Sequence, residues 1–175
     1  MHIDDDHRHY GSAIIQVAED PRCTAIRALR QNGGVSRCGF RIGGLKKKKL
    51  GLFVKYRSTT DVHKPPLYNF PFSKQNLREL EAMRKKRRLR VFLALVCVKA
   101  RQICCLPYED FRGMIDARRA EMGKNEFEYV IKVVLERGCQ FRVAVGAPKR
   151  KGMDTFLEMR TIPRDDFPGR LFLKA

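Results

Sequence analysis

The strongest hydrophobic pattern in the chain is an unbroken apolar run at residues 91–98. A run of strand length with no polar side predicts a central strand that is covered on both faces. A second apolar segment, at residues 102–106, follows a short polar turn and predicts a neighbouring strand. Later apolar segments predict further strands at residues 127–135, 140–145 and 155–159.

Three segments have the spacing of amphipathic helices. Asp20-Pro21 has the form of an N-cap followed by a first helical residue, and apolar positions at helical spacing then continue until an Asn-Gly-Gly sequence after residue 31. Ser73 has the form of a second cap, before a helix whose apolar positions recur at intervals of three and whose last turn is the basic segment 84–88. Residues 108–119 predict a third helix.

The remaining segments complete the predicted domain. Residues 38–42 and 50–57 predict a hairpin with a glycine-rich and lysine-rich turn, whereas the proline-containing residues 58–72 predict a loop or an irregular edge. Residues 1–10 are expected to be a loose N-terminus, before a single domain at residues 11–175. The order α-β-β-α-β-β-α-β-β predicts an α/β (α+β) domain in which helices flank a central mixed sheet.

No apolar run approaches the roughly 20 residues that a membrane-spanning helix needs, so we expect no membrane partner. The N-terminus, with Asp4, Asp5 and Asp6, is acidic where a signal peptide would be basic, which indicates a cytoplasmic protein. Six cysteines without CxxC spacing indicate reduced thiols and no zinc site, and Cys104 and Cys105 are expected to point to opposite faces of their strand. The chain also lacks glycine patterns typical of nucleotide binding, so we predict no cofactor.

Positive charge is concentrated in the middle of the chain. The formal net charge is +18, and residues 41–101 contain 18 Lys and Arg but only 3 Asp and Glu. The apolar fraction of 43% is too high for a disordered basic tail, so we expect a folded domain with a localised cationic face. Clustered cations bind the phosphate backbone of nucleic acids. The predicted contacts are Lys46, Lys47, Lys48, Lys49, Lys55, Arg57, Arg84, Lys85, Lys86, Arg87, Arg88 and Arg90.

Other interpretations of this charge stay open. A cationic face also suits an acidic protein partner or an anionic lipid surface, and charge runs can simply solvate a surface. Aromatic residues beside the basic segment are of the kind that stack on single-stranded bases, although packing of Phe70 and Phe72 into the core is the favoured interpretation. These aromatic residues are Tyr56, Tyr68, Phe70 and Phe72. The sequence does not distinguish DNA from RNA or one strand from two, and it does not reveal the oligomeric state.

Residues 51–58, preceded by the predicted helix and strand, resemble the restriction-endonuclease-like superfamily of PD-(D/E)XK nucleases. In that family a helix leads into a hairpin that carries an early Asp and then an acidic-x-Lys element, and the element order over residues 18–106 agrees. Lys55 matches the family lysine, but Phe53 stands at the acidic position, and no Asp or Glu lies between Pro21 and Thr60. The resemblance therefore implies a nuclease-like fold in which the catalytic acidic positions are lost.

Carboxylates at those positions hold the Mg²⁺ ions that activate water in such enzymes. Because they are missing, we expect a non-catalytic nucleic-acid-binding protein. The alternative is a Mg²⁺-dependent nuclease whose site is rearranged around Glu19, Asp20, Asp61 and Lys55, with at least two of the carboxylates within about 5 Å of one another. A third hypothesis is an interaction module whose basic face binds an acidic protein.

Overall fold

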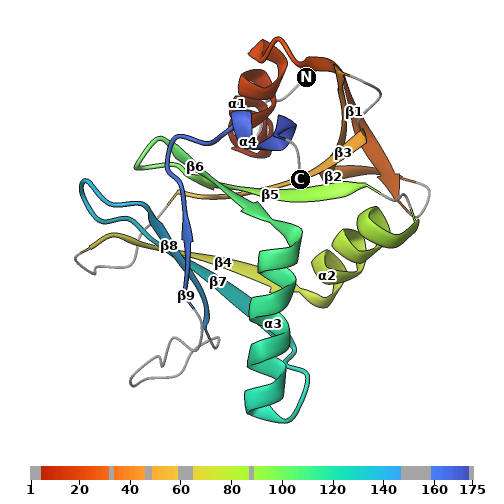
Figure 1. The fold of residues 1–175 in the computed structure, drawn as a ribbon. Helices are drawn as coiled ribbons and strands as arrows, with labels where there is room; N and C mark the ends of the chain where they lie inside the picture. The colour runs from red at the N-terminus through yellow and green to blue at the C-terminus, as the bar shows by residue number, and fades with distance from the viewer. Residues whose placement is uncertain are drawn as a thin grey trace.

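In a computed structural model that describes residues 5–31, 34–45, 49–58, 65–86, 89–146 and 159–173, the chain forms two β-sheets and a set of helices (Figure 1). The five-stranded sheet contains, in spatial order, β1 (Cys23–Gln31), β2 (Gly34–Gly44), β3 (Lys49–Arg57), β5 (Arg90–Cys97) and β6 (Gln102–Pro107). The four-stranded sheet contains β4 (Leu67–Ser73), β7 (Glu128–Val134), β8 (Phe141–Gly146) and β9 (Met159–Ile162). The helical segments are α1 (Asp5–Glu19), α2 (Lys74–Glu81), the π-helical turn η2 (Ala82–Lys86), α3 (Tyr108–Met122) and α4 (Gly169–Phe172).

The predicted α/β (α+β) class is confirmed, and the five-stranded sheet is mixed as expected. The predicted hairpin is present because β2 and β3 pair antiparallel, while β3 pairs parallel with β5. Every residue of β5 from Val91 to Cys97 is buried, as expected of a central strand. The second sheet was not predicted as a separate layer, although the strands β7 and β8 were.

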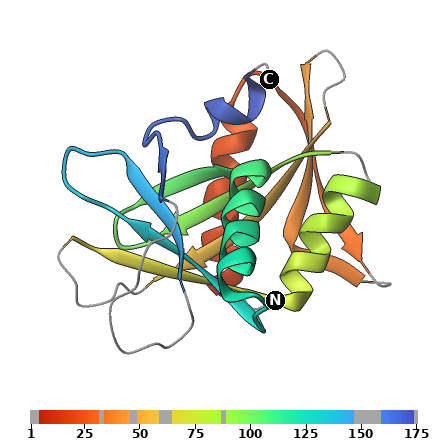
Figure 2. The same cartoon turned by 60° about the horizontal axis from the view of Figure 1, so that its bottom comes forward.

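Two hydrophobic cores lie on opposite faces of the five-stranded sheet. Figures 1 and 2 show α1 and α4 against one face, and the four-stranded sheet with α2 and α3 on the other. Cys104 belongs to the core between the sheets and Cys105 to the core under α1, which confirms that the two thiols point in opposite directions. Burial raises the pKa of both thiols, that of Cys105 to about 12.

The predicted helix at residues 20–31 is wrong, because these residues form the turn before β1 and then β1 itself. The carboxylate of Asp20 accepts hydrogen bonds from the backbone N–H and the guanidinium of Arg22, and the chain then enters the strand. Ile26 packs into the α1 core and Leu29 into the core between the sheets, so their spacing of three reflects two faces of a strand. The helix lies instead at α1, which includes residues 5–10 of the expected loose terminus.

Residues 58–72 were predicted to be a loop or an irregular edge, and their last part forms β4, a regular strand at the edge of the four-stranded sheet. Tyr68, Phe70 and Phe72 alternate along β4 and are buried, so they are core residues. A proline fits here because β4 is an edge strand that pairs only with β7. Pro71 therefore interrupts a sequence pattern without interrupting the strand.

The other two predicted helices are confirmed. Ser73 caps α2, and its side chain accepts from the backbone of Asn76 while the Asn76 side chain accepts from the backbone of Ser73. Leu80 and Met83 are buried against the five-stranded sheet, where Gly51 leaves room for the Met83 side chain. In α3, the residues Phe111, Met114 and Ile115 face the core as expected.

Candidate nucleic-acid interface

Three exposed cations lie on one face of the β1–β2–β3 part of the sheet. Arg27 of β1 is directly opposite Arg41 of β2, and Arg41 is opposite Gly51 of β3. Lys49 precedes Gly51 by two residues and therefore points to the same face. This face is the one away from α1, because Ile26 and Ile42, next to the two arginines, pack into the α1 core. We call Arg27, Arg41 and Lys49 the basic sheet surface.

The basic sheet surface has a uniform charge. The sequence from Pro21 to Thr60 contains no Asp or Glu. None of the three cations makes an ion pair with any residue that the structure describes, and all three side chains are exposed. Since like charges opposite each other destabilise a sheet, the Arg27–Arg41 pair is a local cost to folding that an anion beside it would remove.

The structure places the twelve cations predicted from the sequence in different environments. Lys49 lies on the basic sheet surface, whereas Lys46, Lys47, Lys48, Arg87, Arg88 and the side chain of Lys86 lie outside the described residues. Arg90 donates to the carbonyl of Leu173 at 2.6 Å and lies over the ring of Phe92. The remaining four side chains are held in the interior or in ion pairs, as follows.

Lys55 and Arg57 connect the two sheets. The ammonium group of Lys55 donates to the carbonyl of Pro71 and, at 2.8 Å, to the side-chain oxygen of Asn76. The guanidinium of Arg57 donates to the carbonyl of Asn69 at 2.6 Å. Both carbonyls belong to the edge strand β4, so the two cations bind backbone oxygens that this edge leaves unpaired. Burial lowers the pKa of Lys55.

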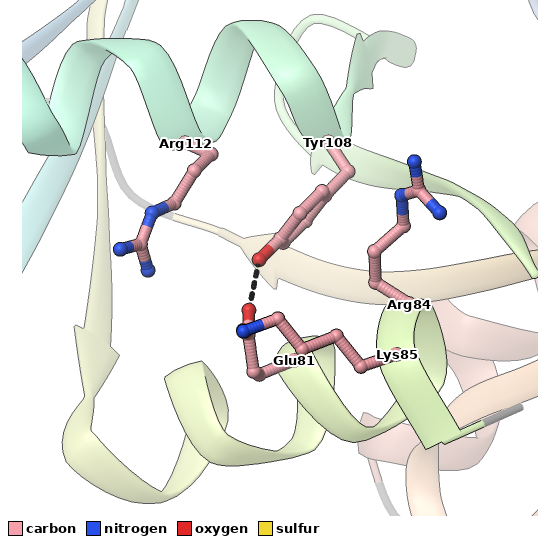
Figure 3. A pocket seen from close by; sticks show the side chains of 5 residues that line it. All are labelled: Glu81, Arg84, Lys85, Tyr108 and Arg112. Carbon is pink, nitrogen blue, oxygen red and sulfur yellow. Dashed lines mark hydrogen bonds and ion pairs between the residues drawn. The ribbon is translucent and has the colours of Figure 1, made fainter. Parts of the chain in front are cut away.

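Arg84 and Lys85 line a cavity of about 500 Å³ between α2, η2 and α3, which we call the helix pocket (Figure 3). Its lining residues are Glu81, Arg84, Lys85, Tyr108 and Arg112. Lys85 lies 2.6 Å from the carboxylate of Glu81, Arg84 lies 3.2 Å from Glu109, and Arg112 lies 2.8 Å from Asp116. Each of the three cations in the helix pocket therefore has a carboxylate partner.

In the helix pocket, the buried Tyr108 contacts the partly exposed Glu81. The Tyr108 hydroxyl donates to Glu81 at 2.5 Å, as Figure 3 shows. Burial, together with this bond, raises the pKa of Tyr108 to about 12, while hydrogen bonds from Lys85 and Tyr108 lower the pKa of Glu81. At neutral pH the phenol therefore stays protonated and the carboxylate stays ionised. This pair does not supply a proton-transfer group tuned to neutral pH.

A second cavity, of about 380 Å³, lies where the β5–β6 turn meets β4 and the segments after β7 and β9. We call it the edge pocket, and its lining residues are Pro66, Tyr68, Lys99, Ala100, Leu135, Arg137 and Arg164. Its three cations come from distant parts of the sequence, and no carboxylate is among the described residues that line it. Sequence analysis missed Arg137 and Arg164 because the charge count for residues 102–175 is nearly balanced, with 14 basic and 11 acidic residues, and it missed Lys99 because this residue lies outside the lysine and arginine runs.

Arg27 and Arg41 were also missed. The prediction of a helix at residues 20–31 hid the pairing of β1 with β2, and only that pairing brings the two arginines together. The predicted strand at residues 38–42, which precedes the lysine-rich turn, could have revealed this pairing, because a strand inside a sheet needs a hydrogen-bonded strand on each side. The aromatic side chains beside the basic segment are likewise not free for base stacking: Tyr68, Phe70 and Phe72 are buried, and Tyr56 contacts the rings of His9 and Tyr10.

Two carboxylates of the nuclease alternative, those of Asp20 and Glu19, lie away from Lys55. Asp20 is held by Arg22 at the end of the sheet where β3 begins, and Glu19 ends α1 on the opposite face of the sheet from Lys55. Six residues of β3 separate Lys49 from Lys55, which is about 20 Å of extended chain. Asp61 lies outside the described residues. In the part of the chain that the structure describes, no three His, Cys, Asp or Glu side chains are grouped to hold a metal ion.

Comparisons of the chain with protein-family models, curated proteins and solved structures find no match. The resemblance to PD-(D/E)XK nucleases therefore stays a prediction. Among the described helices, none is long and apolar enough to cross a membrane.

Proposed function

We propose that the protein binds nucleic acid without cleaving it, and that the basic sheet surface contacts the phosphate backbone. The observation that carries the proposal is the direct opposition of Arg27 and Arg41 on neighbouring strands, both exposed and without a described acidic partner. Folding brings these like charges together, although they repel. A phosphate backbone bound beside the two arginines would reduce their repulsion. Each phosphate contact would also favour binding, because it releases counterions from the nucleic acid.

The geometry of the strands favours an extended polyanion. Cations on adjacent strands have Cβ atoms about 5 Å apart, and diagonal neighbours such as Arg41 and Lys49 are about 7–8 Å apart. The surface thus presents a row of positive charge across β1, β2 and β3. In the sequence, the lysine-rich turn comes immediately before Lys49. Backbone contacts of this kind position a nucleic acid without reading its sequence.

The absence of cleavage in this proposal rests on the carboxylates. Glu19 and Asp20 lie away from Lys55, and Lys55 itself binds Pro71 and Asn76. A hydrolytic site would need acidic ligands for Mg²⁺ beside the bound phosphate. The basic sheet surface is built from strands whose sequence has no acidic residue at all.

The test is fluorescence anisotropy with labelled single-stranded and duplex DNA and RNA, titrated from about 50 to 200 mM salt. The variant is Arg27→Gln with Arg41→Gln. For duplex DNA, the slope of log affinity against log salt should become shallower by about 1.8, because each lost phosphate contact contributes about 0.9. Both side chains are exposed, so the variant should fold normally.

The matched control is Arg8→Gln with Lys124→Gln, which removes the same charge from α1 and from the loop after α3. The control should bind like the wild type. If the two double variants weaken binding equally, the effect is one of net charge and the proposed surface is wrong. If the wild-type protein binds none of the four probes, the proposal of nucleic-acid binding is wrong, and an acidic protein partner becomes the better explanation of the charge.

A further inference from the structure

We propose that the edge pocket binds a phosphate monoester, either on a free mononucleotide or at the phosphorylated end of a nucleic-acid strand. The pocket stands on its own geometry and does not depend on the basic sheet surface. If the monoester is a strand end, the pocket extends the proposed nucleic-acid function by adding recognition of the end. If it is a free nucleotide, the protein has a separate small-molecule site.

Arg164 is the fixed donor of the edge pocket. Its Nε donates to the side-chain oxygen of Gln102 at 2.7 Å, and its Nη1 donates to the carbonyls of Glu136 and Cys139 at 3.0 and 3.1 Å. These acceptors are neutral, so they hold the guanidinium in place without cancelling its charge. Within the described part of the chain, Nη2 has no acceptor and is available to a ligand. A planar guanidinium oriented in advance is well suited to phosphate oxygens.

Lys99 and Arg137 add two further donors to the edge pocket. Both are exposed, and neither makes an ion pair with a described residue. Glu136, the acidic neighbour of Arg137 in the sequence, is instead held by Arg142 at 3.1 Å. The described walls of the pocket therefore have a formal charge of +3 and no opposing carboxylate.

Tyr68 supplies a neutral donor at the base of the pocket. The side chain is only 1% exposed, and its oxygen accepts a hydrogen bond from the backbone N–H of Ala100 at 3.0 Å. No described residue accepts the hydroxyl proton in turn. Burial raises the pKa of Tyr68, so the hydroxyl remains a donor at neutral pH.

These donors select for a monoester. A phosphate monoester has a charge of about −1.5 to −2 at neutral pH, whereas each phosphate inside a strand has a charge of −1. The apolar lining residues Pro66, Ala100 and Leu135 provide surface for the sugar or base next to the phosphate. A cavity of about 380 Å³ lies in the usual size range of small-molecule sites.

The test is calorimetric titration of the full chain with AMP, inorganic phosphate and adenosine. AMP and phosphate should bind and adenosine should not. The variant Lys99→Ala with Arg137→Ala should weaken AMP binding at least about tenfold, because it removes two charge-assisted contacts. The matched control, Arg84→Ala with Arg112→Ala, removes two cations from the helix pocket and should leave AMP binding unchanged.

A second pair of probes identifies the source of the phosphate. One oligonucleotide is prepared with a 5′-phosphate and with a 5′-hydroxyl. If the protein binds the phosphorylated form more tightly, and the double variant Lys99→Ala with Arg137→Ala loses this preference, the pocket recognises strand ends. If the protein binds AMP but binds both oligonucleotides equally, the pocket recognises free nucleotides. Equal binding of adenosine and AMP, or no AMP binding at all, overturns the proposal. Arg27→Gln with Arg41→Gln should not change AMP affinity, so the two proposals can fail separately.

Discussion

The helix pocket and the edge pocket each contain three basic side chains, yet they differ in charge. In the helix pocket, Glu81 pairs with Lys85, while Glu109 and Asp116 hold the two arginines from just outside. In the edge pocket, Arg164 binds neutral oxygens, and the other two cations have no carboxylate partner in the described structure. The positions of the acidic residues, more than the number of basic ones, decide which pocket attracts an anion.

The largest expected difference between the pockets concerns stability. Arg164→Ala should lower the free energy of unfolding by about 2–3 kcal/mol, because it removes hydrogen bonds from a charged group that join β6 to the β7–β8 turn. Arg112→Ala removes only an exposed ion pair within one helix and should cost less than about 0.5 kcal/mol. Urea denaturation followed by circular dichroism measures both values. Equal losses would mean that the edge pocket is no better anchored than the helix pocket.

A smaller effect separates the pockets by pH. Hydrogen bonds from Lys85 and Tyr108 lower the pKa of Glu81 below its unfolded value of about 4.3. Such a group stabilises the fold above that pH, and the stabilisation is lost as the pH falls through the folded pKa. Glu81→Gln should therefore be less stable than the wild type at neutral pH, with a difference that shrinks below about pH 4.

The comparison variant is Tyr68→Phe in the edge pocket. It removes a hydrogen bond to Ala100 but no group that titrates in acid, because burial raises the pKa of Tyr68 further above its ordinary value. Its stability loss should be the same at neutral pH and at about pH 4. Denaturation curves of the three proteins at a series of pH values test this, and a loss for Glu81→Gln that does not change with pH would contradict the assignment.

The smallest expected effect is a gain of binding. Glu109→Gln with Asp116→Asn removes the partners of Arg84 and Arg112, so the helix pocket should acquire weak phosphate affinity. Amide chemical shifts recorded during a titration with inorganic phosphate would report it, with shifts near the helix pocket only in the variant. Shifts of the same size at this pocket in the wild-type protein would show that ion pairing does not block it.

Much of the fold follows directly from local patterns. The buried run of β5, the Ser73 cap and the inward face of α3 are each determined by neighbouring residues, and each prediction is confirmed. The errors arose where a pattern had two causes. Ile26 and Leu29 have helical spacing because they serve two different cores, and Pro71 hides an alternation of aromatic residues that an edge strand tolerates.

The candidate site was much less predictable than the fold. Clustering in the sequence identified Lys55, Arg57, Arg84 and Lys85. In the structure, the first two donate hydrogen bonds to backbone carbonyls, and the other two form ion pairs with carboxylates. The cations without such partners in the described structure, such as Arg27 and Arg41 or Lys99 and Arg137, meet only through strand pairing or tertiary packing. Charge density along a sequence does not report that pairing.

The binding of Lys55 and Arg57 to the carbonyls of Pro71 and Asn69 also bears on aggregation. An edge strand with alternating buried aromatic residues, as in β4, is a template for strand addition from another molecule. The two side chains occupy the acceptors that an incoming strand would need, and they bring positive charge to an edge that would otherwise be hydrophobic. Two of the cations that the sequence suggested for ligand binding thus occupy acceptors that strand addition at the β4 edge would require.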